Sequence, residues 1–163
     1  MAFSRAKALE YVEKYWNTFN PDFHQYSNDC TNFVSQCWNY AGIPMTVGWH
    51  GGIEYITSHP GVTNSDSWVN TDEFYNYMTH EVRGSTPLAV VKWSSTEVNI
   101  GDVVQFWNPG DNAWSHAGII TALDTPYGIT YGYHTDPHFK RPLSDVYPND
   151  YTELRFICPT NAY

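Results

Sequence analysis

The sequence changes its hydrophobic pattern near the middle of the chain. Up to about residue 80, apolar side chains recur three and four positions apart, as on one face of a helix. Later residues form short apolar runs bounded by turn residues, which is typical of strands. Helices followed by strands with hairpin-length gaps indicate an α+β domain, with N-terminal helices packed on an antiparallel sheet of about five or six strands. The predicted strands are 89–93, 103–107, 116–123, 129–133 and 154–157.

The first half of the chain is predicted to hold three helices, over residues 5–19, 30–41 and 72–80, and a short helix over residues 51–58 is an alternative to loop structure there. Ser4 is expected to cap the first helix, Asn28 or Asp29 the second, and Thr71 the last, because such side chains accept hydrogen bonds from the first backbone N–H groups. The remaining residues between 46 and 70 are rich in Gly, Ser, Thr and Asn and are predicted to form a long loop region.

The composition fits one globular domain. The chain has 163 residues, of which 42% are hydrophobic, so a single domain over residues 1–163 is expected. The net charge is −9 with only 8 Lys and Arg residues, which argues against nucleic acid as a partner because phosphate binding needs a basic stripe. No run of 18 apolar residues is present, so no membrane insertion is expected.

Residues 1–16 are charged and lack the apolar core of a signal peptide. Three situations fit this N-terminus. The chain is exported by another route, or it stays inside the cell, or it is a piece of a longer protein.

One cysteine has a position that favours chemistry. Cys30 follows Asn28 and Asp29 at the start of a predicted helix, where the helix dipole favours thiolate over thiol. The unpaired backbone N–H groups there could also stabilise an oxyanion. Buried cysteines are more often core residues than nucleophiles. Cys37, in the middle of the same helix, fits that alternative, whereas Cys30 has polar neighbours.

Two histidines could complete a catalytic site with Cys30. His116 opens a predicted strand, and an imidazole is a suitable acid and base for a thiol nucleophile. His134 ends the next strand, so a hairpin would bring both histidines to the same end of the sheet. There His134, or instead Asp136, could fix the orientation of the His116 ring. The alternative for His116 is an ordinary strand residue that faces solvent.

No metal and no cofactor are expected. His134 and His138 are four residues apart, but Pro137 lies between them and disfavours a regular helix. The three cysteines show no paired spacing of the kind that zinc sites use. A zinc site built from scattered histidines and carboxylates is the alternative.

Aromatic residues make up 17% of the chain, and a surplus beyond one core often lines a binding groove. The residues predicted to form groove walls are Trp49, Trp68, Trp107, Trp114 and Tyr133. The alternative is an aromatic-rich core.

Three segments carry a resemblance to a known family. They are Ser27–Gln36, Ile100–Phe106 followed by Ser115–Ile120, and His134–Asp136 followed by Arg141–Leu143. Together they resemble the putative amidase domain family, related to the NlpC/P60 and CHAP peptidases of the papain-like superfamily. The cysteine segment, SNDCTNFVSQ, is the most specific of the three.

The resemblance implies a papain-like, NlpC/P60-type fold and a single catalytic domain. Cys30 matches the family's nucleophile and His116 its general base, and His134 takes the place of the third, polar member of the NlpC/P60 triad. CHAP peptidases have Gln before the cysteine, whereas Asp29 stands there in this chain. That difference favours the NlpC/P60 arrangement, with backbone N–H groups as oxyanion donors and with Asp29 and Asn28 in supporting roles.

The implied activity is hydrolysis of an amide bond in peptidoglycan, by an amidase or an endopeptidase of a bacterium or a phage. The implied partner is peptidoglycan, met outside the cell or in the cell wall. Since a net charge of −9 would be repelled by anionic wall polymers, a separate wall-targeting domain or partner is expected. The alternatives are a non-catalytic wall-binding module, a metal-dependent amidase, and a thiol protease or transferase with a different substrate.

Overall fold

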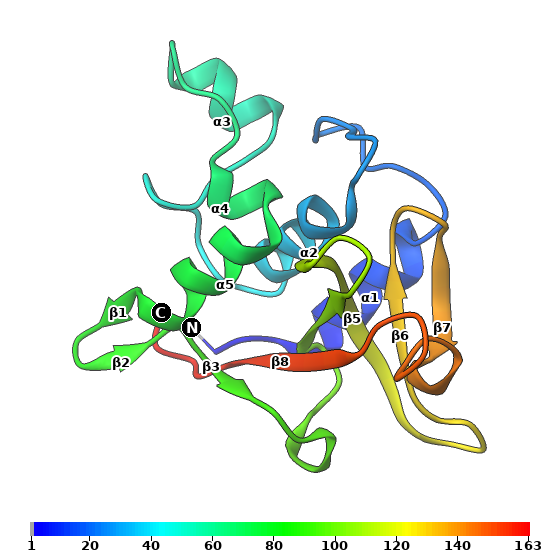
Figure 1. Cartoon of the computed structure of the whole chain (residues 1–163). Helices are drawn as coiled ribbons and strands as arrows, with labels where there is room; N and C mark the ends of the chain where they lie inside the picture. The colour runs from blue at the N-terminus through cyan, green and yellow to red at the C-terminus, as the bar shows by residue number, and fades with distance from the viewer. Residues whose placement is uncertain (1) are drawn as a thin grey trace.

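A six-stranded antiparallel sheet is formed by the second half of the protein (Figure 1). In the computed structural model, which describes residues 2–163, the strand order is β3-β8-β4-β5-β6-β7. The strands are β3 (Ala89–Lys92), β4 (Val103–Asn108), β5 (Ala113–Thr125), β6 (Gly128–Tyr133), β7 (His138–Pro142) and β8 (Glu153–Pro159). The long strand β5 pairs with β4 on one side and β6 on the other.

The helices precede the sheet in sequence and lie mainly on one of its faces (Figure 1). They are α1 (Arg5–Tyr15), α2 (Cys30–Tyr40), α3 (Ile53–Ser58), α4 (Asp66–Val69) and α5 (Thr71–His80). Helix α2 packs against β5 and is flanked by α1 and α4, while α3 projects farthest from the sheet. The α+β architecture with an antiparallel sheet is therefore confirmed. No helix among residues 2–163 has the length and apolar character needed to cross a membrane.

Several short elements were not predicted. They are α4, β7, a hairpin of β1 (Val82–Arg83) and β2 (Thr86–Pro87), and the 3₁₀ turns η1 (Ser95–Glu97) and η2 (Leu143–Asp145). Apart from β7, whose residues do not form an apolar run, these elements are too short for a hydrophobic period to develop. The N-cap of α5 is Asn70 rather than Thr71, because the Asn70 side chain accepts the N–H of Glu73. Ser4 caps α1 as predicted, although α1 ends at Tyr15.

Both faces of the sheet are covered, and alternate residues of each strand enter different clusters. Ala117 and Ile119 of β5 pack with the helices, whereas Ile120 packs on the far face. The far face is rich in aromatic rings and includes Phe106, Tyr131 and Tyr133. A shift of one residue therefore decides which cluster a side chain joins.

Candidate active site

Cys30 is the first residue of α2 and is 1% exposed. Its Sγ atom lies 3.3 Å from Oδ1 of Asn28 and 3.9 Å from the carbonyl oxygen of Ser115. Ser115 immediately precedes His116, so the fold brings together the cysteine segment and the histidine segment from positions 85 residues apart. This proximity follows from the packing of α2 on β5.

The Cys30 thiol is held in its protonated form. Burial raises the pKa of Cys30, and this effect outweighs the backbone N–H groups of Ala117 and Thr31, which lower it. The expectation that the start of the helix favours a thiolate is thus wrong for the protein without substrate. Removing a thiolate from water costs more than the helix terminus returns.

The His116 ring is 9% exposed and lies among aromatic rings on the far face of the sheet. Its centroid is 4.6 Å from that of Tyr133, edge to face, and the ring stacks on Tyr151 at 5.6 Å. Burial, and after it the positive charge of Arg141, lowers the pKa of His116 to about 4. At neutral pH the ring is therefore uncharged and able to accept a proton.

The ring nitrogens of His116 have no hydrogen-bond partner within residues 2–163, and no hydrogen bond joins them to Cys30 Sγ. Among those residues the Tyr131 hydroxyl is the one fully buried side-chain polar atom without a partner. The His116 nitrogens consequently retain access to the pocket that this ring lines. The Cys30 thiol contacts the backbone of β5 next to His116 rather than the imidazole ring itself. Both groups are neutral.

His134 does not orient His116. Its Nδ1 atom lies 2.6 Å from Oδ2 of Asp29, its Nε2 atom contacts the carbonyl oxygen of Tyr15, and the ring stacks on Phe33 of α2 at 4.0 Å. The predicted contact between the two histidines is therefore wrong. They lie at the same end of the hairpin but on opposite faces of the sheet, since neighbouring residues of a strand alternate.

Neither nitrogen of His134 is free to bind a metal, which corrects the alternative of a pair with His138. Asp136 does not orient His116 either. Its side chain is 79% exposed and makes no hydrogen bond to the ring, although its charge slightly favours the protonated form of His116. Within residues 2–163, no group of three or more His, Cys, Asp or Glu side chains is arranged to hold a metal ion.

Asp29 organises the segment before Cys30. Its Oδ1 atom accepts the N–H of Tyr26 at 3.0 Å and the side-chain amide of Asn32 at 2.9 Å. Its own N–H donates to Oγ1 of Thr135 at 3.0 Å. Because these bonds occupy the carboxylate, Asp29 makes no side-chain cap to α2. The first N–H groups of α2 are thus left uncapped beside Cys30.

The predicted roles of Trp49 and Trp68 as groove walls are wrong, because both side chains are completely buried. The indole N–H of Trp68 donates to Oδ1 of Asn32 at 2.9 Å, and that of Trp49 donates to Oγ of Ser35 at 3.3 Å. Through these hydrogen bonds the two buried indoles hold polar side chains of α2 in the core. The sequence suggested a groove only because it does not distinguish buried from exposed indoles.

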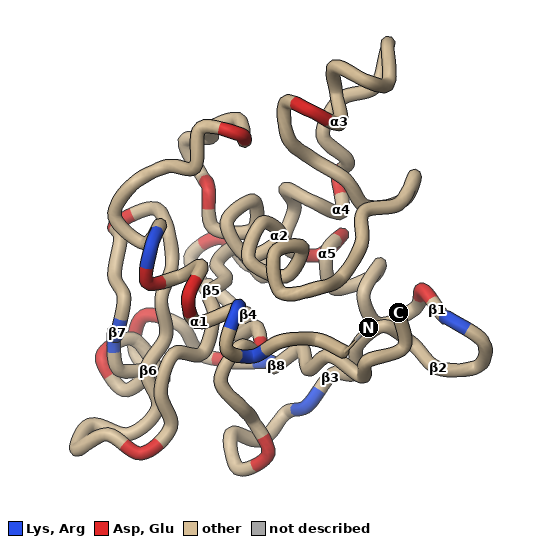
Figure 2. Tube along the Cα trace, turned by 180° about the vertical axis from the view of Figure 1, so that it is seen from behind, with Lys and Arg blue, Asp and Glu red and all other residues tan. Residues whose placement is uncertain are grey.

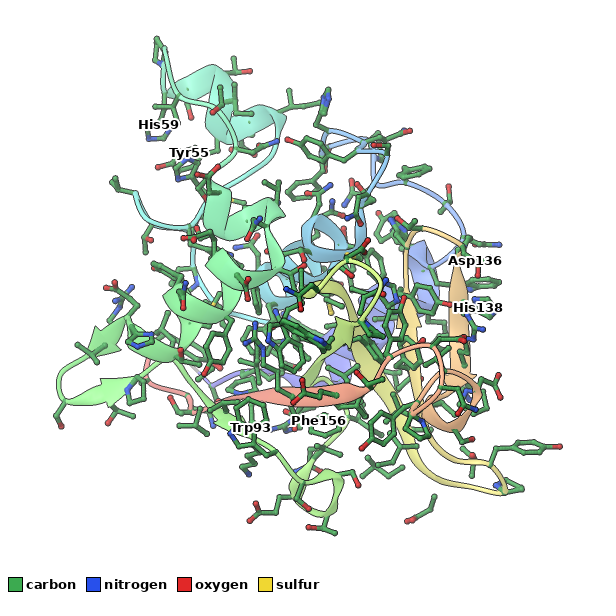
Figure 3. The ribbon with its side chains drawn as sticks, viewed as in Figure 1. Tyr55, His59, Trp93, Asp136, His138 and Phe156 are labelled. Carbon is green, nitrogen blue, oxygen red and sulfur yellow. The ribbon has the colours of Figure 1, made fainter. Side chains whose placement is uncertain are left out.

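The remaining predicted aromatic residues reach the surface or a pocket. Trp107 and Trp114 are half-buried and pack edge to face at 5.6 Å. Trp93, which is labelled in Figure 3 and was not predicted as a groove residue, is 62% exposed. Its ring centroid lies 6.3 Å from that of Trp114. Tyr133 lines the same pocket as His116.

This pocket, here called the His116 pocket, has a volume of about 220 Å³. It is lined by His116, Tyr131, Tyr133, Thr135, Asp136, Arg141, Val146, Asp150 and Tyr151. Sequence reasoning missed Tyr131 and Tyr151, which have no distinguishing motif. Arg141 lies in the third segment that resembles the family, and that resemblance is the sequence signal that could have pointed to it.

Sequence comparison decides the family. The family model described as a putative amidase domain matches residues 2–157. The chain belongs to the putative amidase domain family. Membership suggests an amide hydrolase, and the matched region contains Cys30 and His116. No solved structure matches the chain, so the papain-like relationship stays a prediction.

Two relatives of this amidase-family chain come from Bacillus subtilis (strain 168). The uncharacterized protein YhbB is 31% identical over 122 residues, which cover 75% of this chain and 38% of YhbB. The uncharacterized protein YjcM is 29% identical over 152 residues, which cover 88% of this chain and 34% of YjcM. The chain thus spans little more than a third of the length of these relatives.

Proposed function

We propose that this protein is a cysteine-dependent hydrolase that cleaves an amide bond of peptidoglycan. The observation that carries the proposal is the position of Cys30. The thiol stands at the uncapped start of α2, against the backbone next to His116, in a family of amidases. A thiol, a neutral base on the adjoining strand and uncapped N–H donors are the parts that acyl transfer requires.

In the proposed reaction, the neutral His116 ring takes the proton of the Cys30 thiol as Sγ attacks the substrate carbonyl carbon. The carbonyl oxygen becomes an oxyanion, which the N–H of Cys30 stabilises, together with the side-chain amide of Asn28 after it rotates. The imidazolium then gives its proton to the leaving amine, and the C–N bond breaks. Water, deprotonated by His116, attacks the thioester and releases the acid and the free thiol.

The reaction requires one rearrangement. No hydrogen bond joins Sγ to the His116 ring in the described structure, and the ring is directed toward the far face of the sheet. The ring therefore has to turn toward the sulfur when substrate binds. Because the His116 nitrogens have no protein partner to give up, this turn breaks no hydrogen bond.

The choice of peptidoglycan rests on the family resemblance and on the half-buried aromatic pair Trp107 and Trp114 near Ser115. We place the activity outside the cell or in the cell wall. The two relatives are much longer than the region they share with this chain. That extra length accommodates a wall-targeting domain, which the net charge of −9 calls for.

The proposal is tested by digesting purified Gram-positive sacculi with the wild type, Cys30→Ala and the matched control Cys37→Ala. Mass spectrometry of the released fragments identifies the new amine and carboxyl ends. We expect products from the wild type and from Cys37→Ala, and none from a folded Cys30→Ala. Activity of Cys30→Ala would refute the thiol mechanism, and loss in Cys37→Ala alone would move the nucleophile to Cys37.

One observation favours a second candidate, a wall-binding module without catalysis. The neutral, buried Cys30 thiol lacks a hydrogen bond to an imidazole. For such a module, the wild type would sediment with sacculi and release no fragments from any of them.

A further inference from the structure

The Tyr131 hydroxyl is completely buried and has no hydrogen-bond partner among residues 2–163. An unsatisfied buried hydroxyl is costly, so native proteins rarely keep one without a use. The ring of Tyr131 stacks on that of Tyr133 at 4.9 Å, with an angle of 15° between the planes. Burial raises the pKa of Tyr131, which therefore remains a hydrogen-bond donor at neutral pH.

A guanidinium group lies at the same place. Arg141 of β7 donates from its Nη1 atom to the Tyr133 hydroxyl at 2.6 Å. Since this hydroxyl accepts from Arg141, its own proton is available to another acceptor. The hydroxyls of Tyr131 and Tyr133 and the guanidinium of Arg141 are therefore three neighbouring hydrogen-bond donors.

Within the part of the chain that the structure describes, no buried carboxylate neutralises Arg141. Its acidic neighbours are Asp136 at 3.6 Å and Asp145 at 3.9 Å, and these carboxylates are 79% and 53% exposed. Such long, solvated pairs contribute little. Figure 3 shows Asp136 at the outer edge of the molecule, beside the start of β7. Figure 2 shows that basic residues are few and separated along the chain. The positive charge that Arg141 brings to the His116 pocket is therefore local to that pocket.

We propose that the His116 pocket binds a carboxylate of the substrate, so that the enzyme selects an amide bond next to a free carboxyl group. The inference rests on the proposed function and adds the substrate class. A carboxylate presents two oxygens to the planar guanidinium and accepts from tyrosine hydroxyls at the same time. It satisfies the orphan hydroxyl of Tyr131, and its position beside His116 keeps it close to the reacting carbonyl.

A carboxylate fits this donor set better than an amine does. Asp136 and Asp150 also line the pocket, but both are exposed to solvent. The buried wall that holds Tyr131 and Tyr133 offers donors. An ammonium group would face these donors and Arg141, whereas a carboxamide would present one donor amide where an acceptor is needed.

The test separates binding from cleavage by using Cys30→Ala protein and isothermal titration. The probes are two forms of the peptide acetyl-L-alanyl-γ-D-glutamyl-L-lysine. In one form the α-carboxylate of the D-glutamyl residue is free, and in the other that carboxyl group is amidated. We expect the free acid to bind at least about tenfold more tightly than the amide. Arg141→Gln and Tyr131→Phe, each combined with Cys30→Ala, should remove this preference. Arg83→Gln and Tyr127→Phe, at sites outside the pocket, should keep it.

Tyr131→Phe is the sharper of the two pocket variants. It removes the orphan hydroxyl and keeps the ring, so its melting temperature should equal or exceed that of its parent. Equal affinity for the two peptides, or no binding of either, would overturn the carboxylate inference. Neither result bears on hydrolysis, which the digestion of sacculi by the wild type decides separately.

Discussion

The Oδ2 atom of Asp29 lies 2.6 Å from Nδ1 of His134, and both side chains are almost completely buried. The pair joins the residue before Cys30 to the residue after β6. It is reinforced by the bond from the Asp29 N–H to Thr135. The position of Cys30 therefore depends on a strand hairpin more than 100 residues away in the sequence.

Breaking this pair should destabilise the protein. His134→Gln leaves a buried carboxylate without its imidazole partner, and we expect a loss of about 3–5 kcal/mol in the free energy of unfolding. Urea denaturation measures the loss. Adding Asp29→Asn should recover part of it, because two amides can hydrogen-bond without charge.

A double-mutant cycle provides the control. If the losses from Asp29→Asn and His134→Gln simply add, the two side chains are not coupled and this interpretation fails.

The stability of the protein should fall as the pH is lowered from 7 toward 4. Burial lowers the pKa of His116 to about 4 in the folded state, against about 6.5 in the unfolded chain. Between these values the unfolded chain binds a proton that the folded protein does not. The contribution of His116 to the free energy of unfolding is therefore fully present above about pH 6.5. Below that pH it decreases, by about 3 kcal/mol at most. His116→Gln should weaken this dependence. Identical pH profiles for the two proteins would contradict it.

The Cys30 thiol should react slowly with iodoacetamide in the free protein. Since burial raises its pKa, the thiolate fraction at pH 7 is below that of free cysteine. We expect a rate less than about one tenth of the free amino acid's rate, with the site identified by peptide mapping. Rapid labelling of Cys30 at pH 6 would instead reveal a preformed thiolate. Unfolding in urea should make all three cysteines reactive.

Trp68→Phe should affect stability rather than substrate binding. The change removes the indole N–H that satisfies Asn32 and leaves space in a closed core, at a cost of about 2–4 kcal/mol. The exposed Trp93 provides the matched control, and Trp93→Phe should unfold at the wild-type urea concentration. At a temperature where Trp68→Phe is folded, its KM should equal that of the wild type. A raised KM would restore Trp68 to the substrate groove.

Much of the architecture could be predicted, because the spacing of hydrophobic residues and the positions of turn residues determine local structure. The spacing of apolar residues located α2 with its start at Cys30, and alternating runs located five of the six strands of the sheet. The strand β7 escaped because its residues include His138, Lys140, Arg141 and Pro142, which do not form an apolar run.

The details of the candidate site depend on contacts that the sequence does not encode locally. Cys30 and His116 were identified from the start of a helix and the start of a strand, and the fold brings those segments together. The orientation of His134 depends on which face of the hairpin it occupies, and one position along the strand reverses that face. Tyr131 and Arg141 meet only after β6 and β7 pair, and β7 was not foreseen.

The polar side chains of α2 limit how the sequence of this domain can diversify. Thr31, Asn32, Ser35 and Gln36 are buried, and each is hydrogen-bonded to a different part of the chain: Thr71, Trp68, Trp49 and Tyr11. A saturation library across α2 should therefore yield few folded clones, even at positions whose letters look like surface residues. If the proposed activity holds, variants with altered substrate preference should come instead from the turn between β6 and β7 and from residues 143–151, where changes leave the scaffold around Cys30 intact.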